Sequence, residues 1–180
     1  PVTTIGHGTF IKPMLAKVMP ESKWPKSCII DYKYDGNRYQ IHKQSDSVIV
    51  FNRSGKIVTP QFADIVEEVK EWEQDDFIID TEIYPVYEDG SPAPHKLMGK
   101  RVHSKDKAKA IAECPVKIAI FDILKCGATL LDTIYGARHT VLITQQFPNI
   151  AKYWRTPIDV SIESIYNQAI DAGFEGIMIK

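Results

Sequence analysis

The sequence predicts an α+β fold in which antiparallel β-sheets are flanked by helices. Short apolar segments with alternating patterns follow one another through turns such as Asp35-Gly36, which is typical of antiparallel hairpins. Segments with apolar residues three and four positions apart interrupt these strands at irregular intervals. Because strands and helices do not alternate one by one, the order does not indicate a parallel sheet of βαβ units.

The composition indicates one ordinary globular domain. The chain has 180 residues, of which 44% are hydrophobic and 25% charged, so it can bury a real core. No apolar stretch reaches membrane-spanning length, and the start lacks a basic-then-apolar signal pattern. Cys28, Cys114 and Cys126 fit neither a disulfide scaffold nor a zinc site. We interpret them as reduced, mostly buried thiols of an intracellular, cytoplasmic or nucleoid-associated protein.

The first part of the chain predicts three consecutive strands. Residues 1–27 carry few periodic signals and are expected to form an extended wrapping segment. Residues 28–33 form a strand, residues 38–43 a returning strand after the Asp35-Gly36 turn, and residues 47–51 a third. We expect these strands to form an antiparallel meander with Lys33 at its first bend.

A helix is expected to begin at Thr59, whose hydroxyl would cap it, with Pro60 at the first helical position. Residues 77–84 then form a strand, which ends before a turn at residues 88–92. The residues of the helix expected to face the core are Phe62, Ile65, Val66, Val69 and Trp72.

The last part predicts three helices and two strands. A helix is expected between Ser104 and Pro115, a buried strand over residues 116–124, and a helix over residues 135–147. Ser161 caps a further helix that Gly173 ends, and residues 174–180 form the last strand. The inward residues expected of that helix are Ile162, Ile165, Tyr166, Ala169 and Ile170.

Residues 31–38 carry the most informative chemistry. Lys33 follows Asp31 by two residues and precedes Gly36 by three and Arg38 by five. A lysine amine in this setting could attack a nucleotide phosphate, provided that burial, neighbouring cations or a magnesium ion lower its pKa from the usual value near 10.4. The alternative is a solvated hairpin lysine without chemistry.

Five segments in order resemble the covalent nucleotidyltransferases, which comprise ATP-dependent DNA ligases, RNA ligases and mRNA capping enzymes. The segments are 33–38 (K-Y-D-G-N-R), 51–55 (F-N-R-S-G), 78–83 (I-I-D-T-E-I), 120–124 (I-F-D-I-L) and 175–180 (E-G-I-M-I-K). Residues 12–16 and 38–42 look most similar to archaeal-type DNA ligases. The resemblance implies the DNA ligase and mRNA capping enzyme nucleotidyltransferase core, an ATP-grasp-like fold.

The resemblance also implies roles for single residues. Lys33 would attack the α-phosphate of ATP to form lysyl-AMP and release pyrophosphate. Asp31 would read the adenine edge, although the family more often has Glu there, and Phe121 would stack on the base. Lys180 would contact the α-phosphate. The complete set of implied nucleotide contacts is Asp31, Arg38, Arg53, Glu82, Phe121 and Lys180, and Glu82 and Glu175 are the implied Mg²⁺ contacts.

Other polar residues are interpreted as structural. Asp80 and Asp122 are expected to be structural caps or hydrogen-bond acceptors. The histidines show no metal-ligand spacing, and His42, His95 and His103 are expected at the surface. The formal net charge is −1 and we recognise no basic run, which argues against a general nucleic-acid-binding module.

We therefore expect residues 1–180 to be the adenylation domain of an ATP-dependent DNA ligase, acting in DNA replication, repair and recombination. AMP would pass from Lys33 to the 5′-phosphate of nicked double-stranded DNA, and the 3′-hydroxyl would displace it. The resemblance implies that the C-terminal strands, an OB-fold domain and an N-terminal DNA-binding domain lie outside this chain, so self-adenylation should be weak or absent. The alternatives are an RNA ligase or capping guanylyltransferase core, or a non-catalytic nucleotide-binding fragment.

Overall fold

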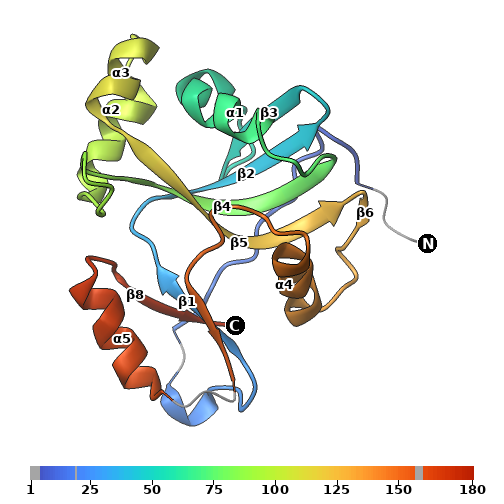
Figure 1. Cartoon of the computed structure of the whole chain (residues 1–180), viewed down its shortest axis with the longest axis vertical. Coiled ribbons are helices and arrows are strands. Elements are labelled where there is room, and N and C mark those ends of the chain that lie inside the picture. Colours follow the sequence, from blue (N-terminus) through green and yellow to red (C-terminus); the bar gives the residue numbers. More distant parts are fainter. Residues whose placement is uncertain (1–4, 19, 157–159) are drawn as a thin grey trace.

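The computed structural model describes residues 5–18, 20–156 and 160–180, and its strands form two antiparallel sheets (Figure 1). The larger sheet has the order β3-β2-β4-β5-β6 and the smaller sheet the order β7-β1-β8. These pairings confirm the expected α+β class. The strands are β1 (Ile29–Lys33), β2 (Asn37–Gln44), β3 (Ser47–Asn52), β4 (Phe77–Pro85), β5 (Val116–Cys126), β6 (Ala128–Thr129), β7 (Tyr153–Arg155) and β8 (Gly176–Ile179).

Helices cover the sheets on several sides. In Figure 1, α1 to α3 lie on one side of the larger sheet, α4 lies beside β5, and α5 covers the smaller sheet. No helix of the described residues is long and apolar enough to cross a membrane. The helical elements are η1 (Glu21–Lys23), η2 (Thr59–Phe62), α1 (Ala63–Lys70), η3 (His95–Leu97), α2 (Met98–His103), α3 (Lys107–Glu113), α4 (Tyr135–Thr144) and α5 (Ile162–Asp171), where η marks a 3₁₀ helix.

The two faces of the larger sheet differ in character. One face carries the main apolar core, in which Ile41, Ile79 and Ile120 of the strands pack with Ile65 of α1 and Leu142 of α4. Burial of these side chains is the main favourable contribution to folding of this part of the chain.

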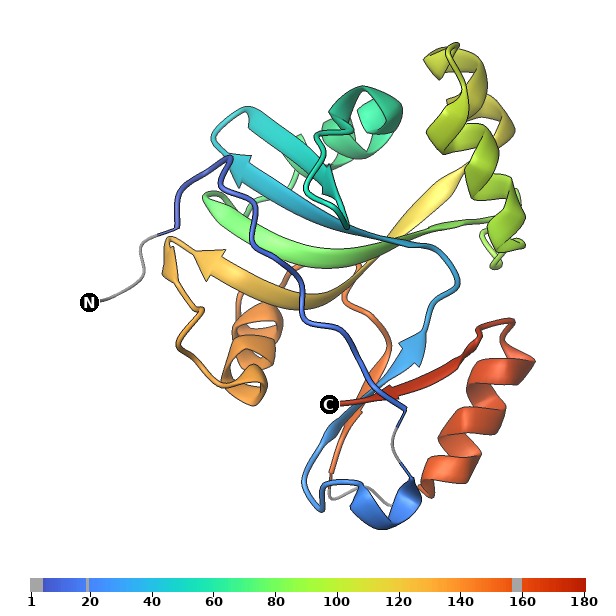
Figure 2. The ribbon, with the colours of Figure 1, turned by 180° about the vertical axis from the view of Figure 1, so that it is seen from behind.

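The opposite face carries polar side chains. In the β2–β4 register, Arg38 lies opposite Glu82 and Gln40 lies opposite Asp80. The N-terminal segment, residues 5–18, runs across this face (Figure 2). The predicted wrapping segment is therefore confirmed for these residues.

The predicted three-strand meander is wrong at its first step. β1 pairs with β7 and β8 rather than with β2, so residues 34–36 cross from the smaller sheet to the larger one. Gly36 permits this crossing, because a Cβ at that position would lie 2.2 Å from the carbonyl oxygen of Ile83 in β4. The turn signal thus marks a close approach between two sheets, which a local pattern does not distinguish from a hairpin.

The first helix also begins differently from the prediction. A 3₁₀ turn, η2, precedes α1, and the Thr59 hydroxyl accepts a hydrogen bond from the Val50 amide at 3.0 Å instead of capping a helix. The expected core face is correct, since Phe62, Ile65, Val66 and Val69 are buried and Trp72 packs against them.

The later helices show one omission and one wrong face. α2 was not predicted, and α3 is capped by Asp106, whose carboxylate accepts from the Lys109 amide at 3.0 Å. Ser161 caps α5 as expected, accepting from Ser164 at 3.1 Å. Tyr166 and Ile170 are exposed rather than buried, because the smaller sheet is narrow and covers only the Ile165 side of α5. Of the cysteines, Cys28 and Cys114 are buried and Cys126 is partly buried, and all three are free thiols.

His42 and Gln40 fasten the N-terminal segment to the sheet. The Gln40 side chain accepts from the Ile11 amide and donates to the Ile11 carbonyl, both at 3.0 Å. The Gly8 amide donates to His42 Nδ1 at 3.1 Å, so the ring hydrogen must be on Nε2, which lies 3.0 Å from Gln40 Oε1. The expectation that His42 lies at the surface is wrong, because this segment buries it, whereas His95 and His103 are exposed.

We predict that His42 stays neutral well below pH 6. Burial lowers its pKa to about 4 in the folded chain. In the unfolded chain the imidazole takes up a proton near pH 6.5, whereas in the folded chain it does so only near pH 4. Its contribution to the free energy of unfolding therefore falls between pH 6.5 and about 4, by roughly 3 kcal/mol. Nitrogen NMR of the imidazole, assigned with His42→Asn, should show the Nε2–H tautomer and a midpoint near 4. A midpoint near 6.5 would contradict the buried network.

Candidate active site

The predicted nucleotide residues meet in a cavity of about 580 Å³ between the two sheets. The smaller sheet contributes the β1 and β8 side, and β2, β4 and β5 of the larger sheet form the other side. The predicted site residues that line this cavity are Asp31, Lys33, Arg38, Glu82, Phe121, Glu175 and Lys180.

Arg53 is the predicted residue that lies elsewhere. It lines an adjoining cavity of about 780 Å³, which shares Gly36, Arg38 and Glu82 with the first. Its side chain is exposed and follows the end of β3. The two cavities therefore form one continuous site with Arg38 and Glu82 at the boundary.

Lys33 is the last residue of β1 and points into the cavity beside Glu175. The Glu175 amide donates to the Lys33 carbonyl at 2.9 Å, which aligns the residue before β8 with the end of β1. The Lys33 ammonium forms an ion pair with the Glu175 carboxylate, and both side chains are about half exposed, at 41% and 49%. The lysine is thus open to a ligand that enters from solvent.

Asp31, two residues before Lys33 on the same side of β1, also lines the cavity and is only 2% exposed. Its Oδ2 accepts from Lys180 Nζ at 2.5 Å, whereas its buried Oδ1 has no hydrogen-bond partner among the described residues. Burial raises the pKa of Asp31, and the neighbouring Lys180 ammonium opposes this shift. An unpaired buried carboxylate oxygen is costly unless a ligand donor completes it.

The structure pairs the Lys180 ammonium with Asp31. The Lys180 backbone pairs with Ile29, and its side chain reaches Asp31, which lies two residues, or about 7 Å, from Lys33 along β1. The Lys180 ammonium lies 4.4 Å from the centre of the Phe121 ring. The contact between Lys180 and the α-phosphate of ATP therefore stays a prediction, with its ammonium held in the same cavity as Lys33.

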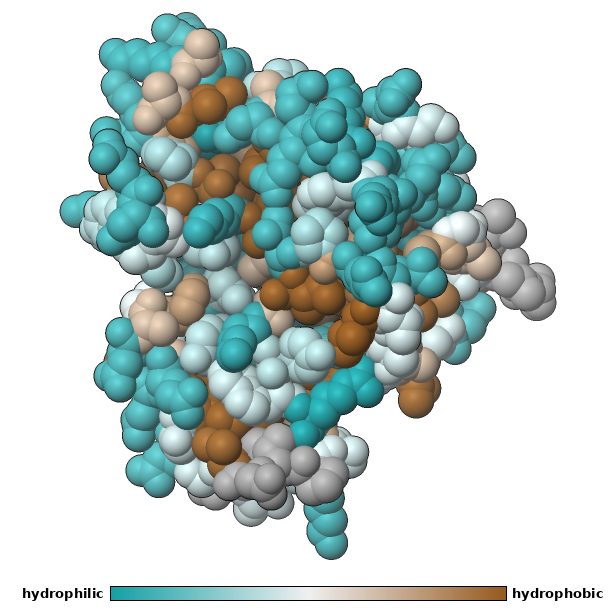
Figure 3. Space-filling model, viewed as in Figure 1, coloured by the Kyte–Doolittle hydropathy of each residue, from teal (hydrophilic) through white to brown (hydrophobic). Residues whose placement is uncertain are grey.

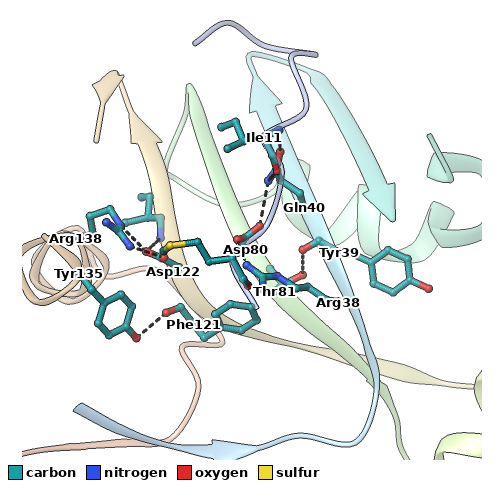
Figure 4. Close-up of polar contacts among 12 residues, drawn as sticks. Ile11, Arg38, Tyr39, Gln40, Asp80, Thr81, Phe121, Asp122, Tyr135 and Arg138 are labelled. Atoms are coloured by element: carbon teal, nitrogen blue, oxygen red, sulfur yellow. Dashed lines mark hydrogen bonds and ion pairs between the residues drawn. The ribbon is translucent and has the colours of Figure 1, made fainter. Parts of the chain in front are cut away.

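Tyr135, at the start of α4, is a cavity residue that the sequence did not predict. Its hydroxyl donates to the Phe121 carbonyl at 2.9 Å and lies 3.3 Å from the Lys180 ammonium (Figure 4). Burial, reinforced by the nearby Asp31 carboxylate, raises the pKa of Tyr135, so the phenol remains a neutral donor. No local signal separates it from an ordinary helix residue.

Arg38 is held in place by groups from two segments. Its guanidinium donates to Asp80 Oδ2 and to the Met14 carbonyl, each at 2.5 Å. Figure 4 shows Asp80 between Gln40 and Arg38, and Gln40 donates to Asp80 Oδ1 at 3.1 Å. The Arg38 Nε is buried without a partner among the described residues. Asp80 is therefore a structural acceptor, as expected.

Asp122 is likewise structural. Arg138 of α4 donates to both of its carboxylate oxygens, at 2.8 and 2.7 Å, and the Ile123 amide donates to Oδ1 at 2.8 Å (Figure 4). This bidentate pair fixes α4 against β5. It therefore sets the distance between Tyr135 on the helix and Phe121 on the strand.

The carboxylates of the site suit a sparsely liganded cation. Burial raises the pKa of Glu82 to about 7, with Arg38 opposing, so near neutral pH a cation would compete with a proton there. No group of three or more metal-type side chains occurs in the part of the chain that the structure describes. Mg²⁺ needs only one or two carboxylates besides waters and phosphates, so Glu82 and Glu175 fit this ion.

Two antiparallel sheets with a lysine at the cavity between them define the class of nucleotidyltransferase domains found in DNA ligases. The family model described as "ATP dependent DNA ligase domain" matches residues 13–180. The chain belongs to this family, which favours a DNA ligase over the RNA ligase and capping enzyme alternatives.

A curated relative and two solved structures support the assignment. The DNA ligase of Saccharolobus solfataricus is 34% identical over 96% of this chain, which spans only 31% of that ligase. The ligase domain of LigD from M. tuberculosis superimposes with a TM-score of 0.68 at 20% identity, covering 93% of this chain and 53% of that one. The Chlorella virus DNA ligase-adenylate has a TM-score of 0.55 at 17% identity, covering 96% and 61%. These two likenesses concern the fold.

Proposed function

We propose that this chain is the adenylation domain of an ATP-dependent DNA ligase and that Lys33 forms lysyl-AMP. The observation that carries the proposal is that Lys33 and an unpaired buried acceptor, Asp31 Oδ1, line the same cavity. The cavity also has an unpaired buried donor, Arg38 Nε. A nucleotide that spans the cavity would satisfy both atoms.

Asp31 and Phe121 form the proposed base subsite. Adenine carries a 6-amino donor that Asp31 Oδ1 can accept, whereas guanine carries a carbonyl oxygen at that position. A base without the donor would leave the buried oxygen unpaired, which disfavours GTP. Phe121 supplies a ring for stacking once the Lys180 ammonium moves from it.

The proposed reaction is a substitution at the α-phosphorus. The Lys33 nitrogen forms a bond to phosphorus, the bond from the α-phosphorus to the bridging oxygen breaks, and pyrophosphate leaves. Lys33 attacks as the neutral amine, so its ammonium proton leaves first, and Glu175, in contact with Nζ, is placed to accept it. The second proton, released as the bond from nitrogen to phosphorus forms, passes to water. Arg38, and Arg53 across the shared boundary, are suited to phosphate oxygens through their planar guanidinium groups.

Mg²⁺ belongs to the same proposal. Glu82 and Glu175 would supply its carboxylate oxygens, and the bound ion would neutralise charge on the phosphates. Sealing of nicked DNA, through transfer of AMP to a 5′-phosphate inside the cell, is proposed for the whole enzyme, because this chain spans about a third of its curated relative.

The test is an intact-mass measurement after incubation with Mg²⁺ and ATP, GTP or NAD in parallel. We expect a mass increase of one AMP with ATP alone, in low yield. Calorimetry should show ATP binding tighter than GTP binding. ATP binding without any adduct would contradict catalysis by this chain and favour the nucleotide-binding alternative. An adduct with GTP instead would overturn the assignment of the base subsite.

We predict that Tyr135→Phe weakens recognition of the 6-amino group. Without the hydroxyl, the Lys180 ammonium loses one of its two oxygen partners, so its position beside Asp31 is less firmly fixed. The preference for ATP over purine riboside triphosphate, which lacks the 6-amino group, should fall about three- to tenfold, the effect of one hydrogen bond. A purely structural role would weaken both ligands alike and leave their ratio unchanged, which calorimetry resolves.

A further inference from the structure

The segment from η3 to α3 concentrates positive charge on a chain that is otherwise acidic. Residues 95–113 contain five lysines and one arginine against two acidic residues, Asp106 and Glu113, giving a formal charge of +4. Because the whole chain carries −1, the remainder carries −5. The expectation that the chain has no basic run is therefore wrong. Figure 3 shows hydrophilic side chains over much of this end of the molecule, at upper left.

Part of this charge is used within the fold. Arg101 is fully buried, donates to the carbonyls of Gln61 and Cys114 at 2.8 and 2.9 Å, and forms an ion pair with Asp64. Lys107 donates to the Ser104 carbonyl. These contacts fix the buried side of the segment to the rest of the domain. The side chains on its outer surface therefore project from a backbone with a fixed position.

Lys109 of α3 forms an ion pair with Glu113 at 3.7 Å, and the outer surface of the segment carries the remaining charge. Lys96, Lys100 and His103 lie at i, i+4 and i+7 of the continuous η3–α2 helix, on the face opposite buried Met98 and Arg101. These three residues and Lys105, in the link to α3, are exposed. The lysines among them have no ion-pair or hydrogen-bond partner in the described ranges 5–18, 20–156 and 160–180. We call Lys96, Lys100, His103 and Lys105 the basic face.

The basic face adjoins the proposed active site. Val102 of α2 lines the 780 Å³ cavity, together with Arg53 and Asn37. His95 Nε2 lies 3.1 Å from the Asn37 side-chain oxygen, so the start of the helix is tied to β2, four residues after Lys33. A polyanion bound on this face would therefore lie next to the mouth of the cavity.

We propose that the basic face binds the phosphate backbone of the DNA duplex beside the nick. The inference rests on the proposed ligase function and assigns a position to its DNA partner. Lys96 and Lys100 lie about 6 Å apart along the helix axis, so they can meet phosphates of one strand. Lysines act on phosphates as point charges without reading sequence, so the contact is independent of sequence. The charge of the remaining chain opposes DNA, which makes a local cationic surface necessary.

The test compares two triple variants of the full chain. K96Q/K100Q/K105Q removes three charges from the basic face, and K23Q/K26Q/K152Q removes three exposed charges elsewhere. Binding to a fluorescent nicked duplex with a 5′-phosphate is measured by anisotropy between about 50 and 200 mM NaCl. The first variant should reduce the slope of log K against log salt by about 2 to 3, that is, about 1 per lost phosphate contact. Its affinity at the lowest salt should fall about tenfold or more.

The control triple variant should bind DNA like the unmodified chain. Both variants should still bind ATP and form the AMP adduct at Lys33 to the same extent as the unmodified chain. Equal slopes for the two variants would overturn the proposal, as would no binding of DNA by the unmodified chain. Equal slopes would be expected if the basic face binds an acidic protein partner instead of DNA. Absence of the AMP adduct in the unmodified chain would contradict the adenylation proposal instead. The failure of the DNA-binding proposal and the failure of the adenylation proposal are therefore distinguishable.

Discussion

Replacement of Lys33 by arginine is expected to abolish the AMP adduct while leaving ATP binding within a few-fold of its original strength. Arginine keeps the positive charge and can still pair with Glu175, but its delocalised guanidinium stays protonated and is not a nucleophile. Loss of the attacking group in a covalent enzyme lowers the rate by at least about 10³-fold, which brings a weak reaction to background. Intact mass gives the adduct and calorimetry gives the affinity.

The matched control is Lys26→Arg, an exposed lysine away from the cavity. It should retain the full adduct yield. An adduct that persists in Lys33→Arg would show that another residue carries the AMP, and Lys180 would then be the first to examine because it lines the same cavity. Loss of both adduct and ATP binding would mean that Lys33 contributes to affinity rather than to chemistry alone.

The sequence predicted most strands and helices because their signals are local. Ser161 caps α5 as its position predicts, and β4 and β5 fall where apolar runs lie. The predictions that failed concern contacts between residues far apart in the sequence. β1 turned out to pair with β7 and β8, more than 100 residues away, and nothing within residues 28–38 distinguishes this from a hairpin with β2.

The site shows the same division. Lys33 and Arg38 share one motif, so their proximity to one cavity follows from sequence. The positions of Lys180 and Tyr135 do not, because they depend on the register of β8 and on the docking of α4. The burial of His42 depends on a segment more than 30 residues upstream in the chain. Motif matching indicated candidate site residues, and long-range packing decided which of these groups contact one another in the cavity.

The buried Asp122–Arg138 pair accounts for much of that docking, and its disruption is expected to cost the most stability. The two side chains are only 10% and 7% exposed. Asp122→Ala leaves the guanidinium buried without its two carboxylate bonds and removes the acceptor of the Ile123 amide. Breaking one partner of a buried pair typically costs about 3–5 kcal/mol. Urea denaturation measures the loss directly, and Tm should fall by about 2–4 °C for each kcal/mol.

Two further variants test whether the loss of stability comes from breaking the buried pair or from a nonspecific effect of the substitution. Glu67→Ala removes one partner of the exposed Lys70–Glu67 pair and should leave the free energy of unfolding nearly unchanged. Asp122→Leu combined with Arg138→Met replaces the buried charges by apolar groups of similar size and should recover most of the stability. In that double variant α4 loses its fixed position relative to Phe121, so ATP affinity should remain reduced although the fold is restored. A loss below about 1 kcal/mol in Asp122→Ala would mean that water replaces the carboxylate, and the pair would then not be what holds α4 in place.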